Sequence, residues 1–167
     1  MQLVMTRRQC LNAVALACLP VAAGSAAGAT KTSSGETKPR SGAPKPEAVV
    51  AAFTSAWNEH RVDNLVRLFT PDGRLKTPAG EGAQSRPGIR RLLVKQHGEV
   101  FRESTLHTTV QDVKHHGAAR ATVTGTFTLD GIPVALGIEV SREGSFTFAL
   151  TRRDGKWLIR SARISTG

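Results

Sequence analysis

Histidine is the residue type in this chain best suited to acid–base chemistry, and two of the five histidines fall on expected helix faces. His97 follows Leu93 by four residues and precedes Phe101 by four, so the three share one apolar helical face. His60 ends the apolar stripe of an earlier helix. An imidazole that faces a pocket can act as a general base near neutral pH. At the edge of a core it is more often a hydrogen-bonded packing residue, so both interpretations stay open.

Glu139 is a third candidate for acid–base chemistry. It is out of phase with the apolar side chains of its segment, which are Val134, Leu136, Ile138 and Val140. If another subunit covers that apolar face, Glu139 faces the pocket. If none does, Glu139 is solvated.

No metal or cofactor is expected. His107 stands alone on a predicted strand, and the adjacent His115 and His116 fall at a turn, whereas a metal site needs three or four convergent ligands. The only cysteines, Cys10 and Cys18, lie in the N-terminal leader, so a processed chain has no thiolate ligand or cysteine nucleophile. No glycine-rich phosphate loop is recognisable.

The elements that must position these side chains follow from the hydrophobic period. A period near 3.6 predicts helices over 46–61, 63–69 and 85–101, with Asp63 and Ser85 as caps. A period of two beyond residue 102 predicts long antiparallel strands. Turns are predicted at 70–73, 130–131 and 154–155. Helices followed by an antiparallel meander indicate an α+β domain.

The first part of the chain has the pattern of an export signal. Residues 1–29 contain Arg7-Arg8, an apolar run and a small-residue cleavage site at Ala27-Gly28-Ala29. The paired arginines favour the twin-arginine route, with general secretion and lipidation at Cys18 as alternatives. Residues 30–46 are expected to form a disordered basic linker before a domain at 47–167. The apolar run is too short to span a bilayer, so a periplasmic or secreted protein without a transmembrane segment is expected.

The charge of the chain does not favour a nucleic-acid partner. The net charge is +10, but residues 47–167 carry 17 basic and 12 acidic side chains, so much of the excess lies outside the domain. No block of five basic residues occurs, and the chain has no tyrosine on which bases could stack.

The element order and several short motifs resemble the nuclear transport factor 2-like superfamily, and its SnoaL-like and ketosteroid isomerase-like domains in particular. The motifs are Val49 to Asn58, Leu68-Phe69-Thr70-Pro71-Asp72-Gly73, Thr77-Pro78-Ala79-Gly80, Pro87-Gly88-Ile89 and Arg153 to Ile159. The resemblance covers about 47–165. It implies a cone-shaped α+β barrel in which three N-terminal helices pack on a curved antiparallel sheet around a pocket.

The resemblance also shows where the family's chemistry is missing. Isomerases of this fold place an aspartate base where this chain has Thr77, and a tyrosine donor where it has Phe53. A hydroxyl without an activator cannot act as a base at neutral pH, and phenylalanine has no proton to donate. The expected pocket residues are Phe53, Trp57, Thr77, Leu93 and His97.

The expected function is therefore binding of a small apolar ligand or a protein partner without catalysis. The first alternative is a SnoaL-like enzyme that uses His60, His97 or Glu139 as its acid–base group. The second is a purely structural homodimer module. A homodimer is expected in any case, because proteins of this fold often pair through the outer sheet face and segments 134–140 and 146–150 are strongly apolar.

Overall fold

A computed structural model describes residues 44–134 and 138–167 of the chain. The predicted signal peptide and residues 30–43 of the predicted linker lie outside this part, and the export route stays a prediction. The elements in chain order are α1 (Ala48–Asn58), α2 (Val62–Arg67), β1 (Phe69–Lys76), β2 (Gly82–Gln84), α3 (Ser85–Gly98), β3 (Thr105–His115), β4 (Arg120–Pro133), β5 (Glu139–Arg153) and β6 (Lys156–Thr166).

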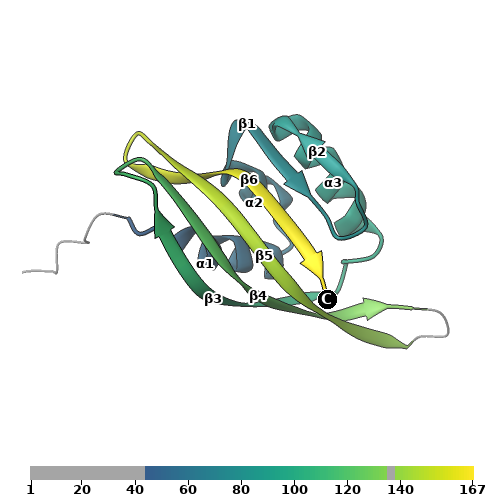
Figure 1. Cartoon of the computed structure of the whole chain (residues 1–167). Coiled ribbons are helices and arrows are strands. Elements are labelled where there is room, and N and C mark those ends of the chain that lie inside the picture. Colours follow the sequence, from purple (N-terminus) through teal and green to yellow (C-terminus); the bar gives the residue numbers. More distant parts are fainter. Residues whose placement is uncertain (1–43, 135–137) are drawn as a thin grey trace, which may run out of the picture. The chain divides into compact units, whose positions relative to one another are not determined.

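The strands form one curved six-stranded sheet in the order β2-β1-β6-β5-β4-β3, with the helices packed against it (Figure 1). The predicted α+β class is confirmed. The prediction of a wholly antiparallel sheet is wrong, because β1 pairs with β6 in parallel. Among the described residues three helices precede the long strands, with β1 and β2 between α2 and α3.

Alternation along the long strands sends the large apolar side chains to the face that the helices cover. On β5 these are Phe146, Phe148 and Leu150, and on β4 they are Val123, Phe127 and Leu129; all are buried. From the helices, Phe53, Leu65 and Leu93 complete the same core. The opposite face of β4 carries Thr122, Thr124, Thr126 and Thr128. The period of two thus separates an apolar inner face from a polar outer face.

This arrangement removes one reason for expecting a homodimer. The apolar side chains of segment 146–150 pack inside the domain, so they add no apolar surface to the outer face. Val134 and Ile138, by contrast, are exposed near the end of the β4–β5 hairpin, which projects beyond its neighbours in Figure 1. Pairing through the outer sheet face would therefore have to use its threonine-rich surface.

Two predicted turns are instead parts of strands. Asp72 and Gly73 lie within β1, where the pairing with β6 shifts register between Phe69 and Arg74. Asp130 and Gly131 lie within β4 at a second register shift. Gly131 has φ +72°, which glycine adopts without strain in a bulge as readily as in a turn. The predicted turn at Asp154-Gly155 is confirmed, since β5 ends at Arg153 and β6 begins at Lys156.

The predicted helix caps are also corrected. Asp63 is the second residue of α2 rather than its cap, and its carboxylate accepts a hydrogen bond of 2.8 Å from Arg90 Nε of α3. This ion pair holds the pKa of Asp63 below its usual value. Ser85 is the first residue of α3, and the cap position before it is held by Gln84, whose side chain makes no capping hydrogen bond. The Asp63–Arg90 pair therefore joins α2 to α3. Local capping motifs in the sequence do not predict this contact.

The last residues of the predicted linker contact the domain. Trp157 Nε1 on β6 donates a hydrogen bond of 2.8 Å to the carbonyl oxygen of Pro44, and Pro46 is buried. Pro44 and Pro46, at the end of the predicted linker, are therefore part of the packed structure. Within 44–134 and 138–167, no helix has the length and apolar character needed to cross a bilayer.

Candidate functional site

A cavity of about 120 Å³ lies between the helices and the inner face of the sheet. Its wall is mostly apolar and draws on both helical and strand elements. The apolar wall residues are Phe53, Trp57, Leu75, Pro78, Ala79, Leu93, Phe101, Leu106, Phe127, Leu129, Phe146, Phe148 and Ile164. Four of the five residues expected in the pocket, Phe53, Trp57, Thr77 and Leu93, lie on this wall.

Five polar side chains interrupt the wall: Thr77, Gln96, Thr108, Arg142 and Thr166. Three of them already bind other protein groups. Thr77 Oγ1 donates to the carbonyl oxygen of Glu81 at 3.2 Å, and Gln96 Nε2 donates to the Glu81 carboxylate at 3.1 Å. The Thr108 hydroxyl shares a 2.7 Å hydrogen bond with that of Thr54. The polar groups of Thr77, Gln96 and Thr108 are therefore already engaged within the protein.

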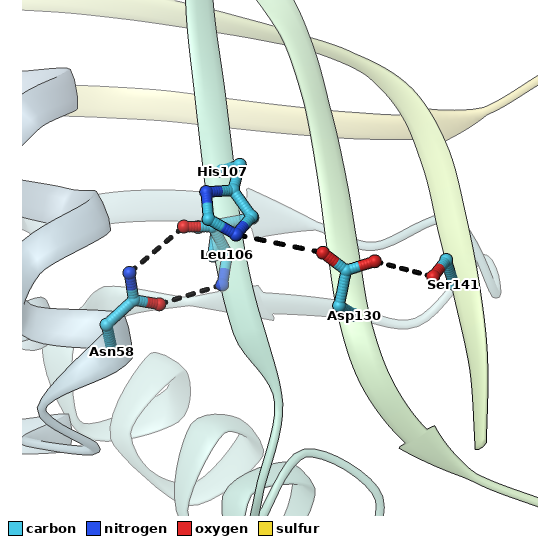
Figure 2. A network of polar contacts seen from close by, with 5 residues as sticks. All are labelled: Asn58, Leu106, His107, Asp130 and Ser141. Carbon is cyan, nitrogen blue, oxygen red and sulfur yellow. Dashed lines mark hydrogen bonds and ion pairs between the residues drawn. The ribbon is translucent and has the colours of Figure 1, made fainter. Parts of the chain in front are cut away.

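Hydrogen bonds hold α1 against β3 at the cavity. The Asn58 side chain bonds both backbone groups of Leu106: its Nδ2 donates to the carbonyl oxygen at 3.0 Å, and its Oδ1 accepts from the amide at 2.7 Å (Figure 2). Trp57 Nε1 donates to Ser104 Oγ at 3.2 Å, which orients the indole. Leu106 and Trp57 are thus fixed on the wall by polar contacts outside it.

His97 does not line the cavity, which corrects its expected place. Its ring packs against Trp57, with centroids 4.5 Å apart, and against Phe101, and both of these residues are wall residues. His97 is only 8% exposed, and its Nε2 has no hydrogen-bond partner among the described residues. Burial, with a smaller contribution from His60, lowers the pKa of His97 to about 4. His97 is therefore a neutral packing residue at pH 7.

The structure brings His60 and His97 together, although the sequence gives no sign of this contact. Their Nδ1 atoms are 3.4 Å apart, so one ring can donate to the other when both are neutral. His60 follows the end of α1 with φ +52° and is exposed. Neither imidazole is on the cavity wall, so neither is placed to exchange a proton with a bound molecule.

Glu139 also lies away from the cavity. It is exposed at the start of β5, where it pairs with Pro133 of β4. Two residues further along, Ser141 Oγ donates to Asp130 Oδ1 at 2.5 Å, and the other carboxylate oxygen of Asp130 lies 3.7 Å from His107 Nε2 (Figure 2). Because Glu139 and Ser141 share one face of β5, Glu139 belongs to the outer, solvated face.

The remaining histidines are dispersed. His115 stacks edge-on against Trp157, and His116 Nε2 is hydrogen-bonded to Thr122 Oγ1 at 3.0 Å. Within the described ranges, no three side chains of the kinds that bind metals converge.

Sequence reasoning missed Arg142. It is the only charged side chain on the described cavity wall, and it lies on the inner face of β5 with Phe146 and Phe148. The signal was present in the sequence, because Arg142 is in phase with those two phenylalanines under a period of two.

Comparisons with known proteins agree with this architecture. A family model described as a SnoaL-like domain matches residues 50–159. No curated protein matches the chain.

Several solved structures share the fold at low sequence identity. They include a candidate scytalone dehydratase from Novosphingobium aromaticivorans (TM-score 0.65, 16% identity, covering 72% of this chain and 80% of that one). A ketosteroid isomerase-like protein from Erwinia carotovora atroseptica has a TM-score of 0.63 and 19% identity. The match covers 72% of this chain and 92% of that protein. An uncharacterised protein with a cystatin-like fold from Caulobacter vibrioides has a TM-score of 0.65 and 18% identity. The match covers 72% of this chain and 86% of that protein. At these identities the likeness shows the fold alone.

Proposed function

Since the chain belongs to the family of SnoaL-like domains, we propose that it uses the cavity of this fold to bind a small apolar molecule and does no acid–base chemistry on it. One observation carries the proposal. The described wall is built from large apolar side chains, and no aspartate, glutamate or histidine contributes to it. Such a wall binds by excluding water from the ligand, and it offers no group that could take up a proton.

The size of the cavity limits the ligand. Pockets for drug-sized molecules measure roughly 300–1,000 Å³, whereas an apolar cavity of about 150 Å³ in another protein binds benzene. A cavity of about 120 Å³ therefore suits a single ring or a short aliphatic chain. A steroid nucleus is too large for this space without rearrangement of the wall.

Isomerases of this fold need catalytic groups at two wall positions. The side chains that this protein has there support binding without proton transfer. Thr77 Oγ1 is engaged with the Glu81 carbonyl, and Phe53 stacks edge-on against Phe148 at a centroid distance of 5.3 Å. Both side chains face the cavity, but neither is a base or a proton donor. The SnoaL-like enzyme is the alternative, and the assay below distinguishes the two functions.

We expect toluene to bind the protein, and we expect the Ile164→Phe variant to weaken that binding at least about tenfold, or about 1.4 kcal/mol. Ile164 is half-buried on the cavity wall, so a larger ring at this position occupies the space that the ligand needs. Val94→Phe is the matched control, because Val94 is 46% exposed on α3 and is absent from the wall. Isothermal titration calorimetry measures all three proteins. Equal affinity in all three, or no binding to the unaltered protein, would contradict the proposal.

We expect no isomerisation of cyclohex-3-enone above the buffer rate. This single-ring β,γ-unsaturated ketone is small enough for the cavity, but the reaction needs both a base and an oxyanion donor. Ultraviolet absorbance of the conjugated product follows the reaction. Turnover that disappears in His97→Ala or His60→Ala would support the enzymatic alternative instead.

A further inference from the structure

Arg142 is the only charged side chain on the cavity wall within the part of the chain that the structure describes. It faces the cavity from β5, directly opposite Leu129 of β4 and in phase with Phe146 and Phe148. Its side chain is also solvent-exposed, so it lies at the edge of the cavity rather than in its depth. Its guanidinium is therefore the group of this wall that can bind an anionic part of a ligand.

Arg142 has no partner within the part of the chain that the structure describes. No carboxylate there, the C-terminal one included, forms an ion pair with its guanidinium, and no hydrogen bond engages it. Thr77, Gln96 and Thr108, in contrast, are hydrogen-bonded to Glu81 or Thr54. The unused hydrogen-bond donors of the wall therefore gather at the β5–β6 end.

Thr166 is a second polar group at this end. It pairs with Gly144 on β5, so Arg142 and Thr166 are diagonal neighbours on the same inner face, a separation of about 7–8 Å in antiparallel sheets. The Thr166 hydroxyl also has no hydrogen-bond partner among the described residues, and it also lines the cavity. A ligand group with two acceptor oxygens can contact both side chains from the cavity edge.

We propose that the cavity selects small apolar molecules that carry a carboxylate, with the apolar part inside and the carboxylate bound by Arg142 and Thr166. This proposal rests on the proposed function. A guanidinium presents parallel N–H donors that match the two oxygens of a carboxylate, and the Thr166 hydroxyl adds a third donor. The apolar wall beside Arg142 reduces the solvation that would otherwise weaken the pair.

Three ligands with the same ring test the proposal: toluene, benzyl alcohol and benzoate. The unaltered protein should bind benzoate about five- to tenfold more tightly than benzyl alcohol, a modest factor because Arg142 remains partly solvated. Arg142→Gln should lose this preference, whereas Arg142→Lys should keep part of it. Arg163→Gln, which removes the same charge from the outer face of β6, should behave as the unaltered protein does.

The outcomes separate the two proposals. If toluene binds in an Ile164→Phe-sensitive manner but benzoate is not preferred, or is preferred equally by Arg142→Gln, the carboxylate proposal is overturned and the apolar cavity stands. If toluene does not bind, both proposals fail, even if benzoate binds elsewhere on the basic surface. Benzoate binding that weakens in both Arg142→Gln and Ile164→Phe supports both proposals.

Discussion

Replacing Gly125 by alanine should lower the free energy of unfolding by about 3 kcal/mol or more, a large effect for the addition of one methyl group. Gly125 lies in the middle of β4, paired with Val110 of β3 and Phe146 of β5. A Cβ atom there would overlap the carbonyl oxygen of Thr109 and lie 2.6 Å from the Phe146 ring. The strand pairing or the cavity wall must move to accommodate it.

Gly98→Ala is the matched control for this substitution. Gly98 ends α3, and a Cβ atom at this position would meet nothing within 4 Å. Alanine there should leave stability unchanged or raise it by up to about 1 kcal/mol. Urea denaturation monitored by circular dichroism measures both variants. A loss below about 1 kcal/mol in Gly125→Ala would show that the sheet has room for a side chain at this point.

The stability of the protein should fall by about 2–3 kcal/mol through His97 alone as the pH is lowered from 6.5 to 4. The folded state holds the pKa of His97 at about 4, against 6.5 in the unfolded chain, so the unfolded chain binds the proton first. Between these values stability rises with pH. Above about pH 8 the residue is neutral in both states and contributes no pH dependence. The neighbours that cause the shift are the aromatic rings of Trp57 and Phe101 and the imidazole of His60.

Comparison with the His97→Phe variant isolates this contribution from the other groups that titrate in acid. Phenylalanine keeps an aromatic ring against Trp57 but takes up no proton. The difference in unfolding free energy between the variant and the unaltered protein should therefore move by about 2–3 kcal/mol in favour of the variant between pH 6.5 and 4. Parallel pH profiles for His97→Phe and the unaltered protein would mean that His97 is solvated in the folded state.

The sequence predicted those parts of the cavity that depend on local period. Phe53 and Trp57 at helical spacing, and Phe146 and Phe148 at a period of two, point to the inside as expected from amphipathic elements. Arg142 follows the same alternation, but an interpretation based on catalytic residue types passed over it. The position of a residue in the hydrophobic period therefore predicted the cavity wall better than its suitability for catalysis did.

The features that sequence reasoning missed depend on contacts between distant segments. The parallel pairing of β1 with β6 joins residues that are about ninety positions apart, which no local pattern encodes. Asp130-Gly131 has the composition of a hairpin turn, yet the same left-handed glycine fits the bulge that the structure shows. His97 reads as a pocket residue from its helix face, but Trp57, on another helix, covers it.

The most direct test of the account is where a small apolar ligand lies in the protein. Intermolecular nuclear Overhauser effects between toluene and protein labelled in its Ile, Leu and Val methyl groups give this position. We expect contacts to Leu93, Leu106 and Ile164 on the cavity wall, and none to the exposed Val94 or Val110. Contacts to the exposed valines without contacts to the wall would contradict it.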